Sequence, residues 1–313
     1  MASVEQPRVL VVILNWNLPE ATISCVESLL ASDYPGQRVL VVDNGSSDDS
    51  VAQLRARFDD RIDLVETGVN LYYAGGSNVG LRWALEAGAD YCLVMNNDTV
   101  VAPDMVSWLV RTALAHPDAG ILGPMICDAH DRSRIWAMGS RRRRWLPMAR
   151  DLGRGEVDQG QYATPLVVDY VTGCAMMVRR EVLTRVGLFD PGYQMYYEDA
   201  DLCARAQAAG FVLLVEPRAK MWHLGAASAN RQAALSRYQK TRYRIRFYRQ
   251  HGHGPLRWLV HPMLWVQESV RASLALKRGE RDLARATWRG LRDGYASKTE
   301  DPQRSGQRSP SAR

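Results

Sequence analysis

Cysteine is scarce in this 313-residue chain. Its copies are odd in number, stand singly within apolar segments and include no Cys-x-x-Cys pair; they are Cys25, Cys92, Cys127, Cys174 and Cys203. This pattern argues against a disulfide framework and against a cysteine-bound zinc site. A reducing, cytoplasmic environment is the expectation that fits it.

Long apolar runs are also missing. The segment "VLVVIL", which ends before Asn15, is too short for the core of a signal peptide and lacks a small-residue cleavage site. No run approaches the roughly 18 apolar residues needed to cross a bilayer. We therefore expect a cytoplasmic protein without a transmembrane helix.

The common phosphate-binding loops are absent as well. The chain has neither the Gly-Lys-Ser/Thr of a Walker loop nor a Gly-x-Gly-x-x-Gly fingerprint. The segment "GGSNVG" (75–80) stands at the entrance of a predicted helix, where backbone amides and the helix dipole favour phosphate. An ordinary helix-entry turn explains the same glycines equally well.

The composition is that of a folded protein with an uneven charge. Apolar residues make up 46% of the chain and charged residues 24%, which predicts a sizeable core. Residues 231–313 hold 19 Lys and Arg against 6 Asp and Glu, whereas residues 1–230 hold 21 against 28. An acidic body with a basic appendage disfavours nucleic acid as a partner, because the body would repel phosphate unless a cation intervened.

The first 130 residues alternate between two patterns. Continuous apolar segments predict strands at 8–14, 38–43, 61–66 and 90–95, and helical patterns follow at about 19–30, 48–58, 78–88 and 103–116. This alternation predicts an α/β fold with a mostly parallel central sheet and helices on both faces. Because ligands lie beyond the carboxyl ends of such strands, Asn15, Asp43 and Asp98 are expected around one crevice.

The rest of the chain is less regular. Residues 130–165 predict an exposed insertion, and strands are expected within 166–180, 211–217 and 219–225, with helices at 180–186 and from about 198. Beyond residue 230 the pattern is helical and basic with a break at Pro262, and residues 296–313 are predicted to be disordered. No internal repeat is present.

Two polar clusters at strand exits suggest a nucleotide and a cation. Asp43, in "DNGSSDDS", can accept the imide N–H of uracil or thymine, although such a cluster also makes an ordinary turn and helix cap. Asn96, Asn97 and Asp98 offer the oxygen ligands that Mg²⁺ or Mn²⁺ prefers, with positions left for phosphate and water. Asp98 lies too far upstream of the helix after Pro103 to be its cap.

A third cluster, "MYYEDADLC", places acids at a helix start beside tyrosines. Acids in a first turn are ordinary helix stabilisers. Here Glu198, Asp199 and Asp201 would repel one another, and a carboxylate in such a loop can take a proton from an acceptor hydroxyl. His223, at the end of a predicted strand, is by itself a structural residue and gains interest only as a partner of Asp98.

Six segments in this order resemble glycosyltransferase family 2, and the bacterial rhamnosyltransferase-like branch in particular. The resemblance covers about residues 8–228 and rests on "VVILNWN", "VLVVDNGSSDDS", "NLYYAGGSNVGLRWAL", "LVMNNDTVV", "VTGCAMMVRREVLTRVGLFDPGYQMYYEDADLCARA" and "MWHLG". It implies the GT-A fold, with a Rossmann-like sheet in residues 1–228, a basic helical region at 229–295 and a tail at 296–313. It also implies an inverting, metal-dependent hexosyltransferase.

The resemblance assigns roles by motif. Asn15 would lie against the nucleobase, Asp43 would bind its N3–H, and Asn78 and Asn96 would line the nucleotide pocket. The metal, Mg²⁺ or Mn²⁺, would be held by Asp98 with His223, and Asp199 would be the general base with Glu198 positioning it or the acceptor. Asn96 departs from the family pattern, because it stands where the first Asp of the Asp-x-Asp motif is expected.

The expected reaction transfers a sugar, rhamnose from dTDP-rhamnose, to a polyprenyl-linked or cell-surface glycan in polysaccharide or cell-wall biosynthesis. The alternatives are a UDP-linked hexose, N-acetylhexosamine or galactofuranose donor, or a catalytically silent scaffold that binds glycan or nucleotide sugar. Arg and aromatic residues interleave in the basic region, which suits an anionic membrane surface and a peripheral position at the inner face of the cell membrane. Packing of these helices on the body is the alternative explanation.

Overall fold

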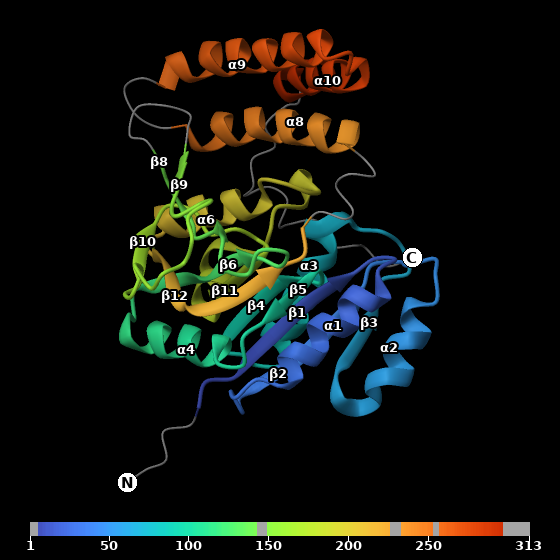
Figure 1. Ribbon diagram of the computed structural model, residues 1–313, viewed down its shortest axis with the longest axis vertical. Helices are drawn as coiled ribbons and strands as arrows, with labels where there is room; N and C mark the ends of the chain where they lie inside the picture. Colours follow the sequence, from blue (N-terminus) through green and yellow to red (C-terminus); the bar gives the residue numbers. More distant parts are fainter. Residues whose placement is uncertain (1–5, 143–148, 226–232, 253–256, 297–313) are drawn as a thin grey trace, which may run out of the picture. The chain divides into compact units, whose positions relative to one another are not determined.

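The computed structural model describes residues 6–142, 149–225, 233–252 and 257–296, which form two compact units. The first unit is built on a ten-stranded mixed sheet, and the second consists of helices (Figure 1). The predicted tail lies outside the described residues, apart from Ala296 at the end of the last helix.

The sheet begins as the parallel structure that the sequence predicts. Its first strands are β1 (Val9–Asn15), β2 (Gln37–Asp43), β3 (Asp63–Glu66) and β4 (Tyr91–Asn96). They pair in the order β4-β1-β2-β3, all parallel. The chain thus builds outward from β1 to β3 and then returns to the other side of β1, which makes the β1–β4 boundary a topological switch point.

Helices cover both faces of this sheet. The strand residues Val9, Val11 and Ile13 pack with α1 (Pro19–Leu30), α2 (Ser50–Phe58) and α4 (Met105–Ala115), whereas Leu10 and Val12 pack with the helices of the opposite face, α3 (Tyr72–Glu86), α5 (Arg180–Val186) and α6 (Glu198–Ala208). Every one of these strand side chains is buried, as expected for strands that read as continuous apolar runs.

The second half of the sheet is mixed, and one prediction for it is wrong in detail. The segments expected as two strands form one long strand, β12 (Val212–His223), which absorbs an irregularity between Glu216 and Lys220. Within the predicted insertion, β7 (Ile135–Ala137) joins this sheet, whereas β8 (Ser140–Arg142) and β9 (Ala149–Asp151) pair with each other in a separate two-stranded sheet. The other strands are β5 (Thr99–Val101), β6 (Ala119–Asp128), β10 (Leu166–Val168) and β11 (Ala175–Arg179), and two 3-10 turns span Asp59–Arg61 and Pro191–Tyr193.

The glycine-rich segment 75–80 lies inside a helix, so its expected place at the entrance of a helix beginning near residue 78 is wrong. Helix α3 begins at Tyr72 and includes all three glycines of the segment. A Cβ on Gly80 would come within 2.2 Å of Val12 Cγ1, and one on Gly76 within 2.5 Å of Leu14 Cδ1. These glycines therefore allow α3 to lie close against β1.

All five cysteines are free and buried in the first unit. Burial raises the pKa of Cys25, Cys92 and Cys203 to about 12 and that of Cys127 to about 11. Burial and two neighbouring acids also raise the pKa of the Cys174 thiol. All five thiols are thus without a disulfide partner.

The second unit contains α8 (Ala233–His251), α9 (Arg257–Lys277) and α10 (Arg281–Ala296) among its described residues. The expected break at Pro262 is wrong, because α9 continues through it. Pro262 lies in the second turn and removes only the bond to the carbonyl four residues earlier. No helix in the described ranges is long and apolar enough to cross a membrane.

The close approach of α3 to β1 can be tested by filling it. We expect Gly80→Ala to cost about 1–3 kcal/mol of stability through overpacking, offset only in part by alanine's helix preference of about 1 kcal/mol. Urea unfolding measures the change, and Val12→Ala supplies the second arm of a double-mutant cycle. A coupling of about 0.5–3 kcal/mol in the compensating direction is expected for touching residues. A Gly80→Ala protein as stable as the parent would contradict this packing.

Candidate active site

The carboxyl ends of β1, β2 and β4 lie side by side. In the parallel register Asn15 is opposite Asp43, and Leu14 is opposite Asn96. The register thus brings Asn15, Asp43 and the end of β4 to one edge of the sheet, where the sequence predicts a crevice with Asn15, Asp43 and Asp98. The candidate site is therefore at the switch point of the sheet.

Asp43 is the centre of a buried polar network. Its Oδ1 accepts hydrogen bonds from Asn15 Nδ2 (2.8 Å) and Ser46 Oγ (2.6 Å), and its Oδ2 accepts one from the Ser46 backbone N–H (3.0 Å). Asn15 Oδ1 in turn accepts a bond from Thr22 Oγ1 (2.7 Å), which also accepts from Asn97 Nδ2 (2.9 Å). A carboxylate has about four lone-pair positions, so Asp43 retains capacity for a further donor.

Asp98 and His223 are brought together by a strand pair. Strand β5 follows Asp98 directly and pairs antiparallel with the end of β12, placing Thr99 opposite His223. The Leu224 N–H donates to the Asp98 carbonyl (2.9 Å), and His223 Nε2 lies 3.2 Å from Asp98 Oδ1. The adjacent Asn97 turns the other way, toward Thr22.

The Asp98–His223 pair is compatible with a divalent cation held jointly with a ligand. His223 is buried, packs its ring 4.6 Å from that of Trp136, and keeps a buried Nδ1 without a hydrogen-bond partner. No group of three or more His, Cys, Asp or Glu residues in the described ranges could hold a metal by itself. Cations such as Mg²⁺ often take only one or two protein carboxylates and complete their shell with phosphate and water, so these residues fit such an ion.

Asp199 lies at the start of α6, where its carboxylate accepts hydrogen bonds from three donors. Oδ2 accepts from the Tyr170 hydroxyl (2.6 Å) and the Gly173 N–H (2.8 Å), and Oδ1 accepts from the Ala200 N–H (2.7 Å). The loop that contains Gly173 also reaches β4, because the carbonyl of the neighbouring Cys174 accepts a hydrogen bond from the Asn96 N–H (3.0 Å). Asp199 is thereby fixed one short loop away from the residues after β4.

Burial raises the pKa values of both acids in the Glu198–Asp199 pair. For Glu198 burial and the neighbouring Asp199 charge raise the pKa well above its usual value, and Glu198 Oε2 has no hydrogen-bond partner. For Asp199 burial raises the pKa, while the three hydrogen bonds oppose that rise. The donors around Asp199 therefore favour its charged form, whereas Glu198 Oε2 has no such donor.

The loop before α6 is held in an unusual conformation. Gln194, Tyr196 and Tyr197 have positive φ angles of 53°, 72° and 73°. Such angles cost a non-glycine residue about 1–3 kcal/mol and persist where surrounding structure enforces them, often at functional sites. The two tyrosines immediately precede the acidic pair.

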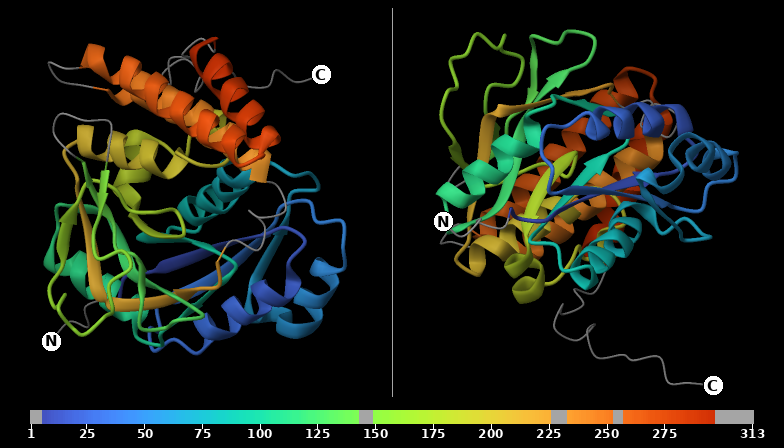
Figure 2. Two further views of the ribbon diagram at one scale, coloured as in Figure 1. Left: turned by 45° about the horizontal axis from the view of Figure 1, so that its top comes forward. Right: turned by 90° about the horizontal axis from the view of Figure 1, so that it is seen from below.

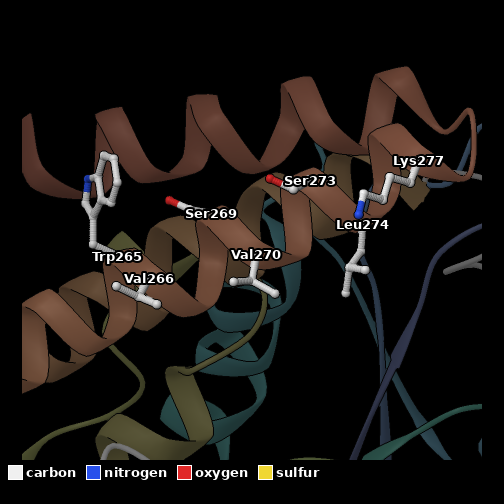
Figure 3. Close-up of a pocket in the computed structure, with 7 residues that line it drawn as sticks. All are labelled: Trp265, Val266, Ser269, Val270, Ser273, Leu274 and Lys277. Atoms are coloured by element: carbon white, nitrogen blue, oxygen red, sulfur yellow. The ribbon is translucent and has the colours of Figure 1, made fainter.

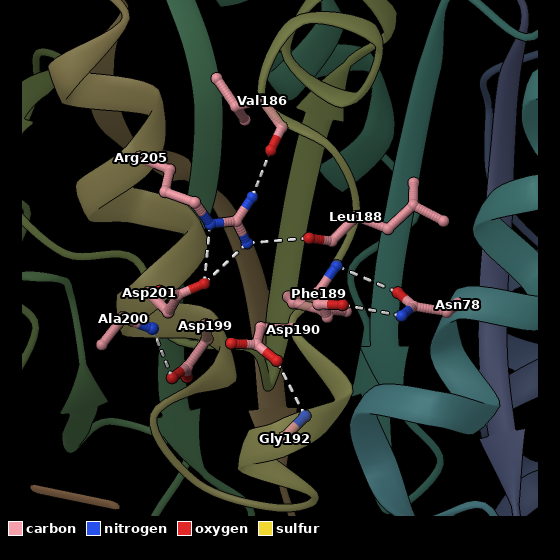
Figure 4. Close-up of polar contacts among 10 residues, drawn as sticks. All are labelled: Asn78, Val186, Leu188, Phe189, Asp190, Gly192, Asp199, Ala200, Asp201 and Arg205. Carbon is pink, nitrogen blue, oxygen red and sulfur yellow. Dashed lines mark hydrogen bonds and ion pairs between the residues drawn. The ribbon is translucent and has the colours of Figure 1, made fainter. Parts of the chain in front are cut away.

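The segment between α5 and α6, which ends in this loop, is held by side chains from α6 and from α3 (Figure 4). Arg205 donates to Asp201 Oδ2 (2.7 Å) and to the carbonyls of Val186 (2.6 Å) and Leu188 (2.8 Å). Asp201 therefore has its own cation, and its charge raises the pKa of Glu198 less than the charge of Asp199 does.

Asn78 has a supporting position. Its amide donates to the Phe189 carbonyl (2.8 Å) and accepts from the Phe189 N–H (3.0 Å), which ties α3 to the loop before α6. Both polar atoms of its buried side chain are used in this way. We therefore leave Asn78 out of the nucleotide contacts proposed below.

Sequence reasoning did not identify Tyr170, Ser46 or Thr22. Tyr170 lies far from Asp199 in the sequence, and only the folding of the segment after β10 brings its hydroxyl to the carboxylate. Ser46 follows Asp43 closely, and its turn-forming position was a usable signal. Thr22 lies on the inward face of α1, and no feature of the sequence indicated its contact with Asn15.

Comparison with known proteins decides the family, since residues 7–244 match the family described as "Glycosyltransferase like family 2". The chain belongs to glycosyltransferase family 2.

Known members and structures agree with this assignment. The chain is 28% identical to the N-acetylglucosaminyl-diphospho-decaprenol L-rhamnosyltransferase of Mycobacterium tuberculosis over 80% of this chain and 88% of that protein. It is 25% identical to the dTDP-rhamnosyl transferase RfbF of Shigella flexneri over 59% of each. The mannosyltransferase PcManGT of Pyrobaculum calidifontis, solved with GDP-Man and Mn²⁺, superimposes over 94% of this chain and 88% of its own at a TM-score of 0.59 and 16% identity. The expected GT-A fold is thus confirmed.

The role of the Tyr170 hydroxyl in this glycosyltransferase can be tested through pH. The expected role of Asp199 as general base requires its ionised form, so under that role kcat/KM should fall as the pH drops through its raised pKa. Tyr170→Phe removes a hydrogen bond that lowers the pKa of Asp199. The fall of kcat/KM on the acid side of the pH profile should therefore move to higher pH by about one unit.

Tyr162→Phe is the matched control, since it removes a hydroxyl bonded to the exposed Glu156. Its profile should equal that of the parent. If the acid side of the pH profile is the same in Tyr170→Phe as in the parent, the role given to the Tyr170 hydroxyl is wrong.

Proposed function

We propose that this glycosyltransferase moves rhamnose from dTDP-rhamnose to a saccharide carried on a polyprenyl diphosphate. The observation that carries the proposal is the convergence of the Asp43 network, the Asp98–His223 pair and the Asp199 carboxylate at one edge of the sheet. The printed names of the rhamnosyltransferase relatives support the choice of sugar and acceptor.

In this proposal the Asp43 network binds the nucleobase. Asp43 is held by Asn15 and Ser46 with its charge buried, so an imide N–H of the base would be a favourable additional donor. Asn15 would lie beside the base and Asn96, at the end of β4, beside the ribose. Thymine and uracil present the same imide edge, so a UDP-sugar donor remains the second candidate.

Asp98 and His223 would hold Mg²⁺ or Mn²⁺ together with the donor diphosphate. When bound, such an ion supplies charge stabilisation to the departing diphosphate. Asp98 contributes the negative charge and His223 a neutral imidazole nitrogen. Asn96, in place of a second carboxylate, removes one charge from this protein shell.

Asp199 would act as the general base. Its carboxylate carries the charge of the acid pair and would take the proton of the acceptor hydroxyl as that oxygen forms a bond to the anomeric carbon. The bond from that carbon to the diphosphate breaks in the same step, which inverts the configuration. Protonated Glu198 would position Asp199 or the acceptor by hydrogen bonding. A silent binding scaffold would have no use for this base.

Substitution of the two adjacent acids separates their roles. Asp199→Asn keeps the shape but removes the base, so transfer should fall by a factor of about 10²–10⁴ while donor binding changes little. Glu198→Gln mimics the protonated acid and should retain most activity. Nucleoside diphosphate release and isothermal titration with donor are the measurements. An active Asp199→Asn protein would refute the role of Asp199 as general base.

A thermal-shift panel tests the donor and the ion together. We expect dTDP-rhamnose with Mn²⁺ to raise the Tm more than UDP-sugars do, and Asp43→Asn to abolish the shift. EDTA should remove both the shift and turnover, with Mg²⁺ or Mn²⁺ restoring them. Turnover that EDTA does not change would rule out a role for the metal. A larger Tm shift with UDP-sugars would show that the donor is a UDP-sugar and not dTDP-rhamnose.

A further inference from the structure

The helical unit has an apolar face that the reaction does not use. On α9 the side chains of Val266, Val270 and Leu274 are spaced four residues apart and are about half exposed (58%, 51% and 46%). They line a shallow groove of about 320 Å³ together with Trp265, Ser269, Ser273 and Lys277, and they follow one another along the helix in Figure 3. We call this surface the α9 face.

The α9 face continues beyond the groove and is almost free of charge. Trp258 and Leu276 extend it toward the two ends of the helix, with 66% and 53% of their surfaces exposed. Between residues 258 and 276 the only charged residues are Glu268 and Arg271, which pair with each other. Glu268 is buried and also binds Arg244 of α8 (2.7 Å). Glu268 thus points into the unit, whereas Arg271 remains about half exposed.

Helix α8, by contrast, is the packed helix of this unit. Tyr243, Ile245 and Phe247 are buried, and Arg249 donates to carbonyls at the end of α10. Among the described residues, α8 is therefore held by contacts within the helical unit itself. The α9 face requires another explanation.

Tryptophan and basic residues border the α9 face. Trp265 packs against Trp288 of α10 with ring centroids 5.8 Å apart, and both rings remain substantially exposed. Exposed basic residues follow where α9 turns into α10, and these are Lys277, Arg278, Arg281 and Arg285. Aromatic rings and basic side chains around an apolar stripe are typical of helices that lie in the headgroup layer of a membrane.

We infer that the α9 face binds the surface of an anionic lipid bilayer, with α9 lying in the plane of the membrane. The apolar stripe would enter the boundary between headgroups and acyl chains, and the basic residues beside it would meet lipid phosphate. A second copy of the chain is the less suitable occupant, because residues 231–313 carry 19 basic against 6 acidic residues and two such units repel each other. This inference goes beyond the proposed reaction and does not depend on the donor or the metal.

Flotation of the full-length protein with vesicles tests the inference directly. Binding is expected to phosphatidylcholine vesicles that contain phosphatidylglycerol, and much weaker binding to phosphatidylcholine alone. The triple variant Val266→Ser, Val270→Ser, Leu274→Ser should weaken binding on the order of one hundredfold, because each side chain loses about 1 kcal/mol of apolar burial. These residues are exposed, so the fold should tolerate the changes.

A matched control has the same chemistry elsewhere. Val157→Ser, Val167→Ser and Leu114→Ser also replace two valines and one leucine that are exposed, but in the first unit. This variant should bind vesicles as the parent does. Arg281→Gln with Arg285→Gln should weaken binding to anionic vesicles on the order of thirtyfold and leave binding to neutral vesicles unchanged, at about 1 kcal/mol per charge.

Three outcomes would overturn the inference. The first is absence of flotation with either lipid, and the second is equal binding by the α9-face variant and its control. The third is a concentration-dependent dimer in light scattering that the α9-face variant abolishes while vesicle binding is unchanged, which would assign the surface to a second copy. Donor hydrolysis, measured without lipid, reports separately on the proposed reaction.

Discussion

The candidate site depends on how the carboxyl end of β4 is held from two sides. On one side β4 pairs with β1, which places Asn96 level with the ends of β1 and β2. On the other side the Asn96 N–H bonds to the Cys174 carbonyl, at the start of the antiparallel strand β11. The first pairing brings the Asp43 network to β4, and the second brings the loop that binds Asp199. Without this double attachment the polar residues would belong to separate parts of the fold.

The electrostatic design follows from burial. Two adjacent buried carboxyls cannot both ionise cheaply, and here three hydrogen-bond donors favour the charged form of Asp199. Asp98 is different, because its partner is a histidine rather than an acid. The first unit thus holds two acids in different surroundings, with Asp199 bonded to a tyrosine hydroxyl and backbone N–H groups and Asp98 beside a histidine.

Much of this architecture could be predicted from the sequence. Alternating strands and helices predicted the parallel part of the sheet, and polar residues at strand exits predicted the place of Asn15, Asp43 and Asp98. The resemblance to the family supplied the partner of Asp98. Three features escaped prediction because they depend on tertiary contacts: the glycines of α3 serve the packing against Val12, Tyr170 reaches Asp199 across the fold, and Asn78 ties the Phe189 loop. Local sequence carries no record of such distant partners.

The buried thiols of the first unit have a practical consequence. A thiol reacts with alkylating reagents as its thiolate and only when reagent can reach it, and burial with the raised pKa values suppresses both in the folded protein. Labelling of these cysteines therefore requires the surrounding sheet to open. Mass-spectrometric detection of the alkylated peptides would give the opening rate near Cys25, Cys92, Cys127, Cys174 and Cys203 individually, without any probe being introduced.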